Sequence, residues 1–81
     1  MDRDDRSRLL GVVECFAAVR DQCPSGAVRR VAEQALARVA RDGAAVLADE
    51  AFLVLSAAQG WRGDRAAQVK RSLRAFLEGR A

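Results

Sequence analysis

Apolar residues recur three and four positions apart along almost the whole chain, and this spacing limits the fold more than any other feature. Near the amino end it is followed by Leu9, Val12, Phe16 and Val19. Residues with this spacing lie along one side of an α-helix. No segment alternates apolar and polar residues as a half-buried strand does. The sequence therefore predicts an all-α fold.

Turn-forming residues divide this pattern. The breaks fall at Pro24-Ser25-Gly26, at Asp42-Gly43 and at the segment from Gly60 to Gly63, because proline cannot continue a helix and glycine suits a helix end. The predicted helices span residues 4–22, 27–41, 49–59 and 64–78. A chain of 81 residues is long enough for one domain and too short for two. We expect residues 1–81 to form a compact four-helix domain with short Pro/Gly turns, able to assemble as a helical dimer.

The residues beside these breaks predict how the helices begin and end. The expected N-caps are Ser25, Asp49 and Asp64, and Gly43 suits the left-handed residue after a helix. The carboxylates of Asp2, Asp4 and Asp5 favour the positive end of the first helix. Gly11 would lie inside that helix at a cost of about 1 kcal/mol relative to alanine. A close approach of another helix would explain it.

The sequence lacks the side chains that most often carry chemistry. It contains no histidine and no tyrosine, so the commonest general base and metal ligand is missing. Two cysteines without histidine do not make a typical zinc site. Gly60 and Gly63 do not have the spacing of a phosphate-binding loop. We therefore expect no enzyme activity, metal, cofactor or small-molecule substrate.

Cys15 and Cys23 are eight residues apart, which is about 12 Å along a straight helix. A disulfide needs Cα atoms within about 7 Å, so we expect reduced thiols and a cytoplasmic location. Cys15 is expected in the core, and Cys23 either there or as an exposed, reactive thiol. The charged residues 2–8 do not resemble a signal peptide, and the weakly polar run 43–58 is too short for a membrane span.

The segment 51–58 has no charged residue. A helix that is apolar all round is buried all round, so this helix is either the centre of the fold or part of an interface. The other helices offer modest cover, because their apolar stripes are rich in alanine and valine. The expected partner surface contains Phe52, Leu53, Val54 and Trp61. Trp61 alternatively closes the end of the core.

The formal net charge is +3, and almost all of the basic residues are arginine. Heavy use of alanine, arginine, valine and glycine is also what a GC-rich bacterial genome produces. The expected surface for an acidic partner or a nucleic acid contains Arg62, Arg65, Lys70, Arg71 and Arg74.

The segment 52–73 also fits a helix-turn-helix in part. Ser56 would be its small residue and Gly60 its turn glycine, with Leu55, Trp61, Ala66 and Val69 as core positions. The DNA-reading face would contain Arg65, Gln68, Arg71 and Arg74. Gln59 stands where an apolar residue is expected, and Gly63 lengthens the turn.

The three residues Trp61-Arg62-Gly63 resemble the Trp-x-Gly turn of small secreted helical-hairpin proteins. That family places the turn between two long helices near the middle of the chain, whereas Pro24 and Gly43 already break this chain earlier. The resemblance covers no further residues.

The leading hypothesis is a small non-catalytic interaction module, an adaptor, regulator or inhibitor, that contacts a protein partner or a second copy of itself. It rests on the surplus of apolar helix surface and on the arginine faces. The alternative is a DNA-binding regulator that uses the basic C-terminal helix.

Overall fold

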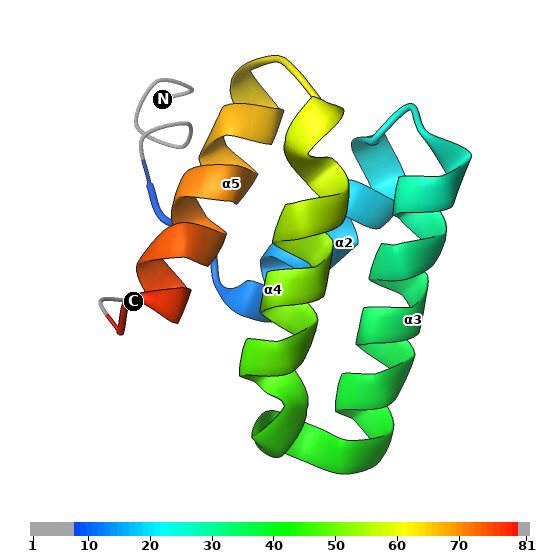
Figure 1. Cartoon of the computed structure of the whole chain (residues 1–81), viewed down its shortest axis with the longest axis vertical. Helices are drawn as coiled ribbons and strands as arrows, with labels where there is room; N and C mark the ends of the chain where they lie inside the picture. Colours follow the sequence, from blue (N-terminus) through cyan, green and yellow to red (C-terminus); the bar gives the residue numbers. More distant parts are fainter. Residues whose placement is uncertain (1–7, 80–81) are drawn as a thin grey trace.

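The computed structural model describes residues 8–79, and regular structure in this part is entirely helical. In chain order the elements are α2 (Val12–Gln22), α3 (Gly26–Asp42), the 3-10 turn η1 (Gly43–Val46), α4 (Leu47–Ala57), the 3-10 turn η2 (Ala58–Gly60) and α5 (Asp64–Leu77) (Figure 1). The predicted all-α class is confirmed. Across residues 8–79, the helices are too short or too polar to cross a membrane.

The helical backbone continues without a coil break from residue 26 to residue 60. The expectation of four separate helices is therefore wrong. The described chain has three continuous helical stretches, residues 12–22, 26–60 and 64–77, and the middle stretch folds back on itself. The reversal begins at Gly43, whose φ of 77° is open to glycine and costly for other residues. Val46 is buried beneath this turn. Its burial anchors the apolar connection 44–46, which contains no turn-forming residue.

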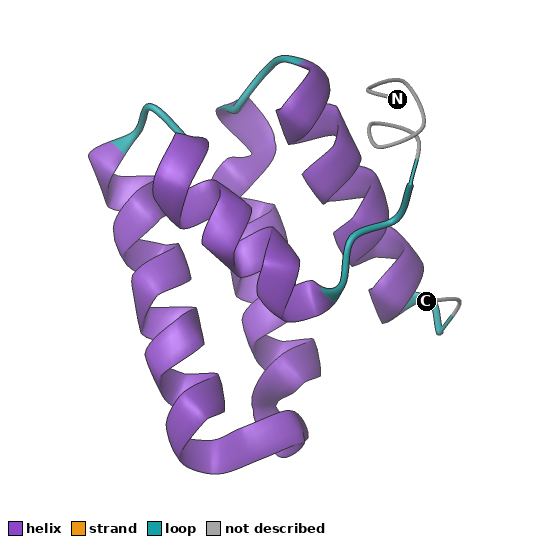
Figure 2. Ribbon diagram, turned by 180° about the vertical axis from the view of Figure 1, so that it is seen from behind, coloured by secondary structure: helices purple, strands orange, loops and turns teal. Residues whose placement is uncertain are grey.

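The elements form one layer backed by a single crossing helix. α3 and α4 run side by side in opposite directions, and α5 lies along the other side of α4 (Figure 1). α2 crosses behind this layer (Figure 2) and contacts all three of these helices. The shortest extent of the Cα trace is 19 Å, and among residues 8–79 no further helix covers the front of α4 (Figure 1).

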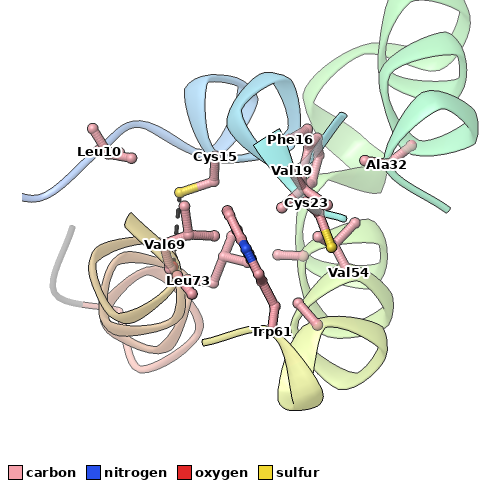
Figure 3. Packing of buried hydrophobic residues seen from close by; sticks show 14 residues of the cluster. Leu10, Cys15, Phe16, Val19, Cys23, Ala32, Val54, Trp61, Val69 and Leu73 are labelled. Carbon is pink, nitrogen blue, oxygen red and sulfur yellow. Dashed lines mark hydrogen bonds between the residues drawn. The ribbon is translucent and has the colours of Figure 1, made fainter. Parts of the chain in front are cut away.

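The core lies where α2 meets this layer. Its largest fully buried apolar side chains include Phe16, Leu73, Val54 and Val69. Trp61 projects from the α4–α5 turn into the space between α5 and α4 (Figure 3). Phe16 and Trp61 belong to this core, whereas 60% of the surface of Phe52 is exposed.

The first described helix begins later than the sequence predicts. Residues 8–11 are not helical, and α2 starts at Val12. Glu14 explains this start, because its carboxylate accepts the Gly11 N–H at 3.1 Å and pairs with Arg8 at 3.0 Å. These donors lower the pKa of Glu14, with Arg8 the larger cause. The residues Asp2, Asp4 and Asp5 lie outside the described part.

Gly11 is therefore the residue before the helix and not an interior glycine. A Cβ added there would come no closer than 4.0 Å to its nearest neighbour, an oxygen of Glu14. The expected close approach of another helix at Gly11 is wrong.

The other caps agree with the sequence in part. Ser25 caps α3 as predicted, since its hydroxyl accepts the Val28 N–H at 3.3 Å. Asp49 lies in the first turn of α4, and Asp64 is the first residue of α5. Neither is an N-cap, because α4 continues directly from η1, and Gly63, with a φ of 114°, occupies the position before α5.

Two buried polar side chains of α5 hold the non-helical segment 8–11. The Ser72 hydroxyl accepts the Leu10 N–H at 2.8 Å and donates to the Gln68 carbonyl at 2.7 Å. The Gln68 amide donates to the Arg8 carbonyl at 3.0 Å. Gln68 is fully buried and Ser72 nearly so. These bonds satisfy backbone groups that no helix provides for, and they fix segment 8–11 against α5.

A third polar contact joins α3 to α4. Arg38 donates to the buried carboxylate of Glu50 at 2.8 Å and also lies 3.7 Å from Asp42. A buried carboxylate requires such a donor. The pair holds the two helices together just above their turn.

We expect Ser72→Ala to lower the free energy of unfolding by about 1–3 kcal/mol, because it leaves the buried Leu10 N–H without an acceptor. Urea unfolding followed by circular dichroism measures this loss. Ser56→Ala removes the same hydroxyl from an exposed position of α4 and should change stability by no more than about 0.5 kcal/mol. Equal stability of the two variants would show that Ser72 does not hold segment 8–11.

Candidate functional site

The side of α4 that faces away from α2 is exposed and partly apolar. Phe52 and Leu53 are 60% and 49% exposed, whereas Ala51, Val54 and Ala58 are fully buried. Figure 1 shows no other described element in front of α4. The uncharged segment 51–58 is therefore central on one side and uncovered on the other, which the sequence left as alternatives.

Two of the four residues expected on a partner surface belong to the core instead. Val54 is fully buried, and Trp61 retains only 9% of its exposure. Figure 3 shows both side chains among the packed residues of the cluster. Their inclusion in an exposed surface is wrong, because α4 directs Val54 towards α2 and the turn directs Trp61 inwards. Trp61 closes the end of the core, which was the other prediction for it.

The positive charge of the described chain is concentrated at its C-terminal end. Residues 8–59 contain six basic and six acidic residues and are neutral overall, whereas residues 60–79 contain five basic and two acidic ones. The difference gives this final turn and helix a charge of +3. The electrostatic field of the molecule is therefore strongest on α5 and the turn before it.

A shallow hollow of about 340 Å³ opens on this basic end. Its lining consists of Trp61, Arg62, Gly63, Ala67, Lys70 and Arg74. Arg62 and Arg74 are exposed, and neither guanidinium group forms a hydrogen bond or ion pair with another residue of the described chain. Their guanidinium groups are available to an acidic ligand.

Lys70 serves the fold as well as this hollow. Its ammonium donates to the Gln59 carbonyl at 2.9 Å and to the Trp61 carbonyl at 2.6 Å. The last carbonyls of a helical segment have no partner within the helix, and Lys70 supplies donors for them. We therefore place Lys70 as a contact between α5 and the end of α4, with its charge at the rim of the hollow.

The Lys70 contact also sets the register of α4 against α5. The helices run antiparallel, so residues before Gln59 lie opposite residues after Lys70. Phe52 is seven residues before Gln59 and Leu77 seven after Lys70, and two helical turns later each helix presents the same flank. From this register we infer that Phe52 and Leu77 lie at the same level of the two helices, with Ser56 and Arg74 about one helical turn closer to the Lys70 contact.

We call this row the α4–α5 seam. It comprises Phe52 and Ser56 on α4, Gln59 on η2, and Lys70, Arg74 and Leu77 on α5. Leu77 is 37% exposed. Ser56 and Leu77 were missed as surface residues of interest, because only the register between the two helices brings them together.

The remaining basic residues of the expected face are divided. Arg71 lies exposed on the outer side of α5. Arg65 is half-buried and donates to the Gln68 side chain. Gln68 is fully buried, so its expected place on a DNA-reading face is wrong. α4 and α5 also lie side by side as an antiparallel pair (Figure 1), whereas the helices of a helix-turn-helix meet at about 90–120°.

Both cysteines are free and buried. Cys15 is in the core as predicted, and its Sγ lies 3.9 Å from the Val69 carbonyl (Figure 3). The alternative of an exposed Cys23 is wrong, since only 2% of that residue is exposed. Burial is the main reason that the pKa of Cys15 rises from 9.0 to about 12. Within residues 8–79, no three carboxylate or thiol side chains gather as a metal site would require.

Comparisons of the chain with protein-family models, with curated proteins and with solved structures found no match.

We expect Cys15 to resist alkylation. At pH 9.0 an ordinary thiol is half ionised, but Cys15 remains protonated, and only the thiolate reacts. In a Cys23→Ala variant, which leaves Cys15 as the only thiol, iodoacetamide labelling followed by mass spectrometry should be roughly 100-fold slower in the native than in the unfolded protein.

The same shift has a consequence for stability. The Cys15 thiol loses its proton at lower pH in the unfolded chain than in the folded one. The stability gained from keeping this thiol protonated in the folded chain is therefore complete below pH 9.0 and is lost as the pH rises towards 12.

Native and unfolded labelling rates of Cys15 within a few-fold of each other would contradict its assigned environment.

Proposed function

We propose that this chain is a small non-catalytic interaction module that binds a protein partner through the uncovered side of α4 and the basic face of α5. One observation carries the proposal: Phe52 and Leu53 are half or more exposed on a helix whose other side is fully buried. Exposed neighbouring apolar side chains of this size mark association sites in small proteins, and aromatic residues are frequent at their centres.

The charges of the chain support the same proposal. Arg62 and Arg74 lie at the hollow on the turn and α5, and α5 packs beside α4, so apolar and charged contacts are both available to one partner. Arginine is the basic residue that interfaces favour, because its planar group pairs with a carboxylate through two hydrogen bonds. The proposal includes the absence of catalytic activity, because the sequence contains no histidine and no tyrosine. It also includes a cytoplasmic location, because both cysteines are free.

A second copy of the chain is one candidate for the partner. Phe52 and Leu53 would then meet their counterparts across a two-fold axis. Sedimentation of the purified protein distinguishes a dimer from a monomer that binds something else.

The alternative is a DNA-binding regulator, and the concentration of the net charge on residues 60–79 is what favours it. Arg71 and Arg74 would contact phosphates, and binding would weaken steeply with added salt. The buried position of Gln68 and the antiparallel pairing of α4 and α5 argue for the protein-binding proposal.

We expect Phe52→Asp to abolish partner binding and leave the fold intact, because Phe52 is exposed and a charge at the centre of an interface is costly. The measurement is affinity capture of the tagged chain from its native lysate, with one half treated with nuclease. The wild type should retain a stoichiometric protein partner in both halves. The amount of partner captured by Phe52→Asp should be lower by a factor of roughly 30 or more.

Ala37→Asp is the matched control, since it adds the same charge at an exposed position of α3. It should bind as the wild type does. Val54→Asp should instead unfold the domain, because Val54 is fully buried. Equal capture by Phe52→Asp and the wild type would exclude the α4 surface, and loss of every captured protein on nuclease treatment would favour the DNA-binding alternative.

A further inference from the structure

We infer that the α4–α5 seam binds an acidic amphipathic helix of a partner protein, with an apolar side chain of that helix between Phe52 and Leu77 and a carboxylate at Arg74 and Arg62. This inference rests on the proposed function and adds to it the binding site and the chemistry of the partner.

The dimensions of the seam fit a helix. Phe52 and Gln59 on one side, and Lys70 and Leu77 on the other, are each separated by seven residues, which is about 10.5 Å along a helix. A bound helix presents side chains with the same rise at positions i, i+4 and i+7. One of its faces therefore spans the seam from the apolar end to the basic end.

The two ends of the seam differ in chemistry. Phe52 and Leu77 are 60% and 37% exposed, so an apolar side chain placed between them removes apolar surface of both from water. At the other end the hollow beside Arg74 and Arg62 is lined by cationic side chains. A matching helix carries a large apolar residue and, one to two turns away, Asp or Glu.

The charge distribution selects an acidic partner over a second copy of the chain. A symmetric dimer through this seam would bring no carboxylate to Arg62 and Arg74, because the seam of the second copy contains no Asp or Glu, whereas an interface pairs opposite charges. Most acidic residues of the segment 8–59 are already occupied: Glu14, Asp21, Asp42 and Glu50 each pair with an arginine. The free cationic groups of the seam are thus left for a different protein.

The apolar end selects a protein over a nucleic acid. Contacts to phosphates use cationic and polar groups, and they offer nothing to Phe52 and Leu77. An amphipathic helix uses both ends of the seam at once.

The test is selection of helical peptides from a displayed random library on the full-length protein, followed by affinity measurements on the selected synthetic peptides. We expect enrichment of Asp or Glu four to seven residues from Leu or Phe. Binding should weaken by about tenfold or more in Arg74→Glu and should also weaken at high salt. Arg30→Glu is the matched control, because Arg30 is exposed on α3 far along the chain from the seam, and it should retain affinity.

Selection of no peptide, selection of peptides without acidic enrichment, or equal losses in Arg74→Glu and Arg30→Glu would overturn the inference. Salt-sensitive binding of duplex DNA that Arg74→Glu removes and Phe52→Asp leaves unchanged would overturn it as well. The proposed function fails separately: a partner captured from the lysate that needs Phe52 and binds Arg74→Glu normally would preserve the interaction module and exclude its acidic ligand.

Discussion

Lys70 joins α5 to the turn that follows α4, where the two surface helices meet. Lys70 is the single lysine of the chain, and its ammonium satisfies two carbonyls at the turn that follows α4. Because these groups would otherwise lack donors, the contact favours one register of α4 against α5. The placement of Phe52 opposite Leu77, and of Arg74 between them and the hollow, follows from that register.

The opposite flank of α5 is held by segment 8–11. Ser72 and Gln68 bind backbone groups of residues about 60 positions away in the chain, and Arg65 covers Gln68. α5 is thus fixed from two sides, by α4 and by this segment. Among residues 8–79, the outer side of α5 and the seam remain for a partner, and the guanidinium groups of Arg74 on α5 and of Arg62 in the preceding turn have no partner there.

The sequence predicted the elements that depend on local chemistry and missed those that depend on distant residues. The helical spacing, the break at Pro24 and the Ser25 cap follow from neighbours in the chain, and the structure agrees with them; at Gly43 the chain reverses but remains helical. The bonds of Ser72 and Lys70 join separate elements, so no periodicity reveals them. Glutamine is usually a surface residue. Gln68 is buried because its amide donates a hydrogen bond to the Arg8 carbonyl of segment 8–11.

The candidate surface was predicted in part for a similar reason. A helix without charged residues has no polar side, so its sequence does not tell which residues face the core. Phe52 and Leu53 were therefore grouped with Val54, although α2 covers only the last of these. The exposed arginines were correctly placed near the C-terminal helix, but the separation of Arg65 from Arg62 and Arg74 required the position of segment 8–11.

The most direct measurement is the set of nuclear Overhauser contacts between the Phe52 ring and the methyl groups of Leu77 in the isotope-labelled protein. The register set by Lys70 predicts contacts between these two side chains, together with contacts between the Lys70 side chain and the turn at Gln59 and Trp61. Contacts of the Phe52 ring with residues one turn earlier or later on α5, and none with Leu77, would contradict that register and the seam that depends on it.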